Sequence, residues 1–139
     1  MRTAQPTVLV GIVLASVATL ALTGCSDSAP RVSTKHFTTY SEAVHSSSAG
    51  SIPGILPADA TDIRLALRQD GPGGAELTWH SAGGLTASYC AAGAIKRTVE
   101  PIPTVGWWPQ GTPSTGWDCT RWKAFTKGGV FYAWDDHKN

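Results

Sequence analysis

The chain has 139 residues, of which 42% are hydrophobic, with 11 basic and 10 acidic side chains. This near balance leaves no strong positive field, so the sequence gives no support for nucleic acid or for anionic lipid as a partner. The length suits one small domain.

An uncharged apolar segment lies close to the N-terminus, over residues 8–22. It falls short of the roughly 20 residues that a membrane-spanning helix needs, and it matches the apolar region of a secretory signal. Arg2 precedes this segment, and the small residues Thr23 and Gly24 follow it. We therefore predict that residues 1–24 are a signal peptide.

The motif Leu22-Thr23-Gly24-Cys25 resembles the lipobox of bacterial lipoprotein precursors at every position. The resemblance implies cleavage before Cys25, with Leu22, Thr23 and Gly24 recognised by the signal peptidase. It also implies a diacylglyceryl group on the sulfur of Cys25 and fatty acids such as palmitate. Two or three acyl chains hold a protein durably at a membrane, so the expected location is the extracytoplasmic face of the bacterial cell membrane. An ordinary secretory signal, or an uncleaved short anchor ending in Cys, is the alternative.

The chain contains three cysteines. Once Cys25 is assigned to lipid, Cys90 and Cys119 remain as an even pair in an oxidising compartment, which predicts a disulfide. The alternative is that one of them is a nucleophile or a metal ligand, but the sequence has no CxxC motif and no histidines paired at ligand spacing. We expect neither a metal nor a cofactor.

The mature chain begins with a polar stretch, so residues 25–36 are predicted to be a flexible tether. Residues 37–139 are predicted to form the globular domain. A short helix is expected over residues 39–45, because Thr38 or Thr39 can cap it and Glu42 lies near the capping-box position. An ordered crossing loop with two prolines follows over residues 52–57.

Alternation of apolar and polar residues predicts a strand from Thr61, with Ile63, Leu65 and Leu67 inward. After a glycine-rich turn at 70–74, residues 75–81 form the next expected strand. In that strand Leu77 and Trp79 face inward, while Glu76, Thr78 and His80 face outward. Further strands are expected over residues 85–90, 94–100, 122–126 and 130–134, the last two joined in a hairpin through Lys127-Gly128-Gly129. The predicted class is α+β: a small single domain with a short N-terminal helix, then antiparallel meander and hairpins, and one disulfide.

The segments Phe37-Thr38-Thr39-Tyr40-Ser41-Glu42-Ala43 and Ala60-Thr61-Asp62-Ile63, with Ile52-Pro53 and Leu56-Pro57 between them, resemble the N-terminal part of YbbD-type bacterial domains. The resemblance spans roughly residues 37–79. It departs from the family pattern at Gly50-Ser51-Ile52-Pro53, where the family loop usually carries Trp. It implies an envelope location and a fold, and it brings no catalytic residue.

All six tryptophans lie after residue 78, and Trp107, Trp108 and Trp117 fall within the span between the two paired cysteines. Prolines and glycines keep that span irregular, so these indoles are candidates for a binding surface toward a glycan or a protein. The alternative is that they fill the core or pack on proline rings. Trp79, Trp122 and Trp134 lie on strand-like alternation and are predicted to be core residues.

Motifs for nucleophilic or metal-dependent hydrolysis, such as G-x-S-x-G and H-E-x-x-H, do not occur in the sequence. To act in catalysis, His80 would need a carboxylate such as Asp62 or Glu76 that folding brings close to it. Without such a partner, His80 is interpreted as an exposed strand residue. Asp135-Asp136-His137 is interpreted as a solvated C-terminal tip rather than a metal site.

These observations favour a lipid-anchored, non-enzymatic cell-envelope protein that contacts an envelope protein or glycan. The alternatives are a glycan- or small-ligand-binding module that uses exposed Trp and, less favoured, an envelope hydrolase.

Overall fold

The computed structural model describes residues 31–70, 74–101 and 105–137. The predicted signal peptide, the lipobox with Cys25, and the tether up to residue 30 lie outside the described residues. Residues 71–73 of the expected turn also lie outside them.

Within these described residues, seven strands form one sheet in the order β1-β2-β3-β7-β6-β5-β4, and every neighbouring pair is antiparallel. One short helix and one 3-10 turn accompany the sheet in the same part of the chain. The predicted class, a small single α+β domain dominated by antiparallel pairing, is therefore confirmed. The elements are β1 (Val32–Thr39), α1 (Tyr40–Val44), η1 (Ala49–Ser51), β2 (Thr61–Arg68), β3 (Ala75–His80), β4 (Ala91–Ala94), β5 (Thr115–Cys119), β6 (Trp122–Lys127) and β7 (Val130–Asp135).

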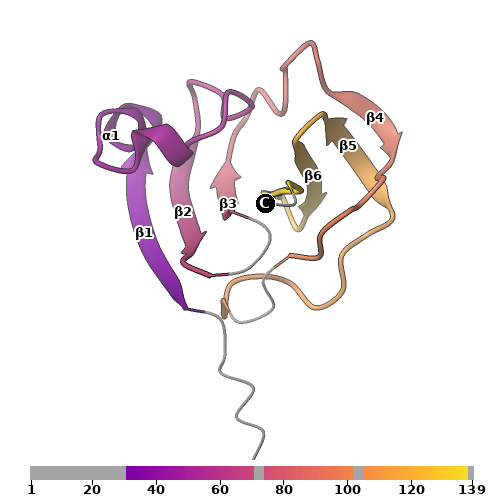
Figure 1. The fold of residues 1–139 in the computed structure, drawn as a ribbon. Coiled ribbons are helices and arrows are strands. Elements are labelled where there is room, and N and C mark those ends of the chain that lie inside the picture. The colour runs from indigo at the N-terminus through magenta and orange to yellow at the C-terminus, as the bar shows by residue number, and fades with distance from the viewer. Residues whose placement is uncertain (1–30, 71–73, 102–104, 138–139) are drawn as a thin grey trace, which may run out of the picture.

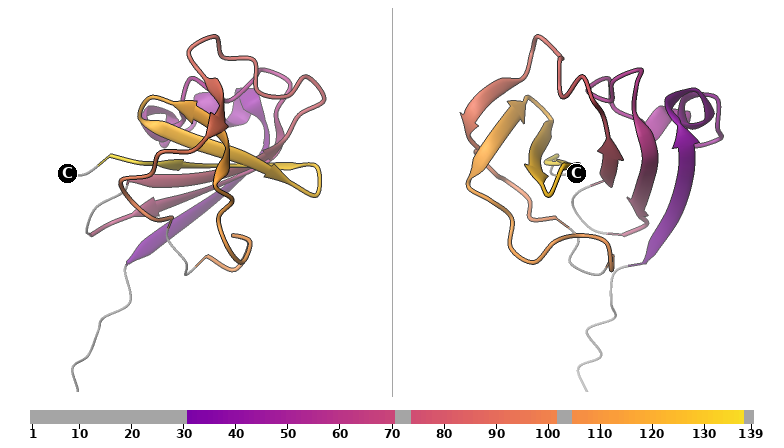
Figure 2. Two further views of the ribbon diagram at one scale, coloured as in Figure 1. Left: turned by 90° about the vertical axis from the view of Figure 1, so that its right-hand side faces the viewer. Right: turned by 180° about the vertical axis from the view of Figure 1, so that it is seen from behind.

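The sheet consists of two meanders joined at its centre. Strands β1, β2 and β3 follow one another, and β4 to β7 run back toward them, so that β3 pairs with the last strand, β7. Figure 1 shows the strong bend between the two halves, with α1 at one end of β1, and Figure 2 shows the same bend from the side and from behind. The connection of residues 81–90 crosses from one half to the other at the same end as α1 (Figure 1).

Helix α1 begins where the capping pattern predicted. The hydroxyl of Thr39 accepts a hydrogen bond from the backbone N–H of Glu42 at 3.3 Å, and the Glu42 carboxylate accepts one from the N–H of Thr38 at 2.7 Å. The first bond satisfies an N–H group that a helix start leaves without an intrahelical partner, and the second ties the Glu42 side chain back to the residue before the N-cap. The helix itself is confirmed, but it follows a strand rather than opening the domain.

The tether prediction is wrong from Val32 onward, because β1 pairs with β2 from Val32 opposite Arg68 to Thr39 opposite Thr61. Phe37 is the only fully buried residue of β1. An edge strand of this kind is held mainly by backbone hydrogen bonds, so it lacks the apolar alternation that marks a half-buried strand.

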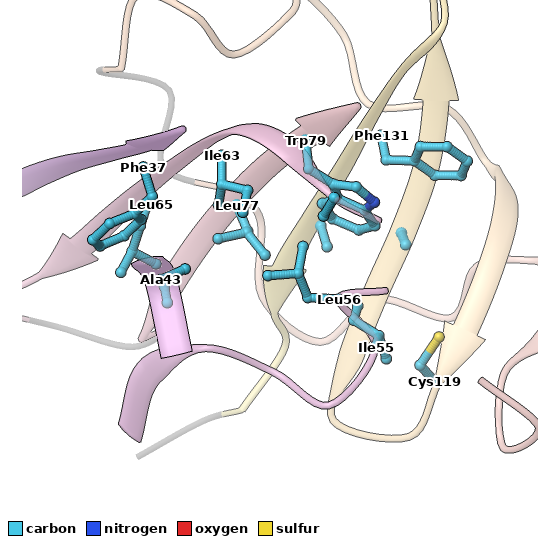
Figure 3. Packing of buried hydrophobic residues seen from close by; sticks show 14 residues of the cluster. Phe37, Ala43, Ile55, Leu56, Ile63, Leu65, Leu77, Trp79, Cys119 and Phe131 are labelled. Carbon is cyan, nitrogen blue, oxygen red and sulfur yellow. The ribbon is translucent and has the colours of Figure 1, made fainter. Parts of the chain in front are cut away.

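The main core covers one face of the sheet, and Figure 3 shows its packing. Ile63 and Leu65 of β2 and Leu77 and Trp79 of β3 lie side by side, as the alternation predicted. Ile55 and Leu56, from the proline-containing loop of residues 52–57, approach them from the opposite side (Figure 3). The ordered crossing loop is thus confirmed, with Ile55 and Leu56 buried and Ile52 half-buried.

Strand β3 is buried on both faces, which corrects the prediction that Glu76 and Thr78 face solvent. Glu76 is 1% and Thr78 is 4% exposed. They lie opposite Trp134 and Tyr132 of β7 in the register. Because β3 is a central strand and its second face is covered by other residues, its outward-facing positions are buried as well. Only His80, at its end, is exposed as predicted.

The predictions of strands over residues 85–90 and 94–100 are also wrong. Residues 85–90 form a connection that ends in a turn, with the N–H of Cys90 bonded to the carbonyl of Ala87 at 3.0 Å. The strand of this region is β4, and every residue of it is exposed. The predicted disulfide between Cys90 and Cys119 is confirmed and ties this connection to β5. Strand β4 is held by the neighbouring disulfide and by its pairing with β5 at the edge of the sheet. Neither interaction requires apolar residues to alternate along the sequence of β4.

The hairpin of β6 and β7 matches the prediction closely. Gly128 and Gly129 at its tip have φ angles of 60° and 79°. A two-residue turn with both central φ angles positive suits the right-handed twist of the strands, and glycine adopts it without a steric penalty.

Candidate binding pocket beside Trp107

The second face of the sheet carries a smaller aromatic cluster. Ile95, Phe125 and Trp134 are buried there, and Trp108 and Tyr132 pack against them. The Trp108 ring meets Phe125, Tyr132 and Trp134 edge-on, with centroids 5.6 to 6.3 Å apart. Edge-to-face contact is a favoured geometry for aromatic rings. Trp108 therefore fixes the irregular segment before β5 to the sheet.

Trp107 is adjacent to this anchor and lies in a different environment. Its ring centroid is 6.1 Å from that of Trp108, and the two planes are inclined by 57°. Trp107 is half-buried and lines a pocket of about 360 Å³ together with Thr34, Lys35, His36 and Arg64. The pocket thus joins an indole from the segment before β5 to polar and basic side chains of β1 and β2.

Strand pairing explains why these polar residues gather. His36 of β1 lies directly opposite Arg64 of β2 in the antiparallel register. Thr34 is two residues before His36 and shares its face of the sheet. Residues directly opposite each other in such a pair have Cβ atoms about 5 Å apart, so their side chains interact.

The carboxylate of Asp62 organises this part of the surface. One of its oxygens is 2.7 Å from Nε2 of His36, and the other is 3.7 Å from Nε2 of His80 and 3.7 Å from a guanidinium nitrogen of Arg64. Asp62 has a φ of 47°, at the register shift between Thr61 and Arg64. A β-bulge of this kind redirects a side chain relative to the regular pleat, and here it accompanies the approach of Asp62 to both imidazoles.

The cluster lies at the surface, with the side chains of His36 and Asp62 exposed by 59% and 42%. A histidine–carboxylate pair is one component of an acid–base catalyst, but catalysis also needs a reacting group within reach and a site that limits water. An exposed arrangement of donors beside an indole is better suited to holding a ligand. Among residues 31–70, 74–101 and 105–137, no group of three or more His, Cys, Asp or Glu side chains is placed to hold a metal ion.

The side chains of Asp135 and Asp136 are buried and hydrogen-bonded. This corrects the interpretation of residues 135–137 as a solvated C-terminal tip. Asp136 is 8% exposed and accepts hydrogen bonds from the N–H groups of Thr98 and Val99 and from the Thr98 hydroxyl at 2.6 to 2.9 Å. Burial alone would raise the pKa of Asp136, but these hydrogen bonds and the charge of Lys123 together hold that pKa below its usual value. The side chain fastens residues 98 and 99 to the end of β7.

Asp135 is 3% exposed and pairs with Arg121 through two hydrogen bonds, of which the one from Nε to Oδ1 is 2.7 Å long. Hydrogen bonding to Asp135 raises the pKa of Arg121 above its ordinary value. The pair borders a smaller pocket of about 180 Å³ that also contacts Trp122. The Asp135 carboxylate that borders this pocket is already paired with the guanidinium of Arg121.

The three indoles predicted as a binding surface do not form one surface. Trp107 and Trp108 are neighbours on the second face, whereas Trp117 lies on β5 and packs against Phe131 and the main core. All three are half-buried. Of the predicted core indoles, Trp79 and Trp134 are confirmed as buried, and Trp122 is half-buried against the main core.

The residues of the pocket other than Trp107 were not predicted as site residues. Thr34, Lys35 and His36 lie on β1, within or beside the stretch predicted to be a tether, and Arg64 was interpreted only as an outward strand position. The β-branched residues Val32, Thr34, Thr38 and Thr39 were the available signal for a strand there. The pairing of His36 with Asp62 has no counterpart in the local sequence.

No protein-family model, curated protein or solved structure matches the chain. The resemblance to YbbD-type domains stays a prediction. In the described part of the chain, no helix has the length and apolar character required to cross a membrane.

Proposed function

We propose that this chain is a lipid-anchored, extracytoplasmic binding domain without catalytic activity. The location is supported by the lipobox motif and by the disulfide between Cys90 and Cys119. Stable disulfides of this kind are typical of oxidising compartments outside the cytoplasm. The pairing also leaves Cys25 as the single cysteine for lipid attachment.

The location is tested by expressing the wild-type precursor and a Cys25→Ala variant in a bacterial host and separating membrane from soluble fractions. The wild type is expected in the membrane fraction, with a mature N-terminus at Cys25 that carries acyl chains by mass spectrometry. The variant is expected to lose the acyl mass and its durable membrane association, because two or three acyl chains supply the anchoring. A Ser26→Ala variant is the matched control and should behave as the wild type.

Identical fractionation of wild type and Cys25→Ala, together with an unmodified N-terminus, would contradict this location.

The binding activity is proposed for the pocket beside Trp107, with a saccharide or another small polar ligand as its occupant. The observation that carries it is the half-buried indole of Trp107, which lines one pocket together with polar and basic residues of β1 and β2. Its volume of about 360 Å³ lies in the range of about 300 to 1,000 Å³ that is usual for small-molecule sites. An indole supplies a flat apolar surface for a sugar ring, while neighbouring donors and acceptors satisfy its hydroxyl groups.

A screen of immobilised glycans with the full-length protein in detergent tests this activity. A Trp107→Ala variant is expected to lose binding that the wild type shows. An Arg97→Gln variant changes a cation outside this pocket and should retain it. Equal binding by Trp107→Ala and wild type to every retained glycan would exclude this pocket as the site.

A further inference from the structure

We infer that the ligand of the pocket beside Trp107 is an acidic saccharide, a sugar whose ring bears a carboxylate. This inference rests on the binding function proposed above and adds the chemical class of the ligand.

The charge around the pocket is the first argument. Arg64 is the cation that shares the face of Thr34 and His36, whereas Lys35 pairs with the core residue Leu65 and alternates onto the opposite face. Asp62 is the carboxylate that borders the pocket through His36 and Arg64. The guanidinium of Arg64 is therefore the cationic group that can attract a carboxylate into the pocket.

The geometry of Arg64 is the second argument. Its guanidinium is 3.7 Å from the nearer Asp62 oxygen, and its side chain is 46% exposed. This distance exceeds that of a normal hydrogen bond, so the N–H groups of the planar fork retain capacity for a further acceptor. A carboxylate is the acceptor whose two oxygens match that fork.

The position of His36 is the third argument. Asp62 holds its Nε2 at 2.7 Å and thereby fixes the orientation of the imidazole beside the pocket. A preoriented side chain loses less conformational entropy when a ligand binds. His36 and the hydroxyl of Thr34 are then available for the ring hydroxyls of a sugar, whereas Arg64 receives its carboxylate.

Trp107 distinguishes a sugar acid from a simple anion. The neighbouring Trp108 packs against three other aromatic rings. This packing fixes the position of the segment that contains Trp107. The apolar C–H face of a pyranose ring can lie on this indole while the ring's carboxylate reaches Arg64. An inorganic anion would pair with Arg64 and gain nothing from the indole.

The test uses isothermal titration calorimetry on the full-length protein in detergent, at low salt and neutral pH. The probes are oligogalacturonate, an oligomer of alternating glucuronate and N-acetylglucosamine, and sialyllactose. Each is compared with its carboxyl-reduced counterpart. At least one acidic probe is expected to bind roughly tenfold more tightly than its reduced form, because a charge-assisted pair is lost in the latter.

Two variants assign that preference to the pocket. Arg64→Gln should abolish most of the roughly tenfold preference while leaving binding of the reduced form unchanged. Trp107→Ala should weaken both forms. Arg97→Gln is the matched control with an arginine elsewhere, and far-UV circular dichroism verifies that each variant is folded.

The two proposals fail in different ways. Trp107-dependent binding that is equal for acidic and reduced probes would overturn the acidic preference and leave the binding function in place. Binding of inorganic phosphate or acetate as tight as that of the acidic sugars would also overturn it. Failure of all acidic and reduced probes to bind would overturn the saccharide assignment altogether.

Discussion

Trp107 and Trp108 hold their rings 6.1 Å apart, yet only Trp108 meets three further aromatic rings edge-on. Adjacent residues of the same type therefore have different roles: one holds the segment on the sheet, and the other lines the pocket.

The first prediction follows from this difference. Trp108→Ala is expected to lower the free energy of unfolding by about 3 kcal/mol, because it removes a large ring from the aromatic cluster. Trp107→Ala should cost less, about 1 kcal/mol, because this half-buried indole is not part of the aromatic cluster. Urea denaturation followed by far-UV circular dichroism measures both without depending on the deleted indoles. Similar losses in the two variants would show that Trp108 is not the anchor.

A second prediction compares two buried tryptophans. Trp79 is stacked on Phe131, with centroids 5.3 Å apart, and its indole nitrogen has no hydrogen-bond partner among the described residues. The indole nitrogen of Trp134 donates to the carbonyl of Val99 at 3.0 Å. Replacement by Phe removes a similar volume at both sites, but at Trp134 it also leaves a buried acceptor unpaired.

Trp134→Phe should therefore destabilise the fold by about 1 to 2 kcal/mol more than Trp79→Phe. Thermal and urea unfolding of the two single variants give this difference directly. A larger loss for Trp79→Phe would mean that its indole nitrogen is hydrogen-bonded in solution, for example to water.

A third prediction concerns acid stability. Because hydrogen bonds and Lys123 hold the pKa of Asp136 below the ordinary value of 3.8 in the folded state, its ionised form stabilises the fold at neutral pH. That stabilisation is fully present above pH 3.8, the ordinary value, and is lost as the pH falls through the lower folded pKa. Asp136→Asn should cost about 2 kcal/mol at pH 7, and its deficit against wild type should shrink as the medium is acidified below this value.

Urea midpoints measured from pH 7 to pH 2.5 test this dependence. Glu100→Gln, at a carboxylate whose side chain is 71% exposed, is the control and should follow the wild type. A constant deficit of Asp136→Asn over the whole range would rule out the ionised carboxylate as the source.

The disulfide provides a fourth prediction. Cys90 and Cys119 are 29 residues apart, and opening a loop of this length increases the entropy of the unfolded chain. A Cys90→Ser, Cys119→Ser double variant should lose about 3.5 kcal/mol of stability. Reductant should destabilise the wild type by a similar amount and leave the double variant unaffected. Sensitivity of the double variant to reductant would point to another cause.

A fifth prediction concerns the close approach of β5 and β6. A Cβ atom on Gly116 would lie 2.2 Å from the carbonyl oxygen of Ala124 and 2.9 Å from the side chain of Ile95. Because a backbone atom cannot move as a side chain can, Gly116→Ala should cost about 2 to 3 kcal/mol. Gly50→Ala is the matched control, since nothing lies within 4 Å of its added Cβ. Equal unfolding midpoints for the two variants would contradict the tight strand contact.

Local patterns in the sequence determined several elements of this protein. The capping residues Thr39 and Glu42 marked the helix, the alternation along 61–68 marked β2, and two glycines marked the hairpin of β6 and β7. The cysteine count predicted the disulfide. Each of these depends on interactions between residues close in the chain, or on a simple pairing rule that leaves one solution.

Only the tertiary structure decided the remainder. Edge strands β1 and β4 are stabilised by backbone pairing with their neighbours, which requires no apolar alternation of their own. The burial of Glu76 depends on the second covered face of a central strand, and that of Asp136 on residues 37 and 38 positions earlier in the chain. The pocket beside Trp107 joins β1, β2 and the segment before β5, so its composition follows from strand register and from the anchoring of Trp108, neither of which is encoded in a local motif.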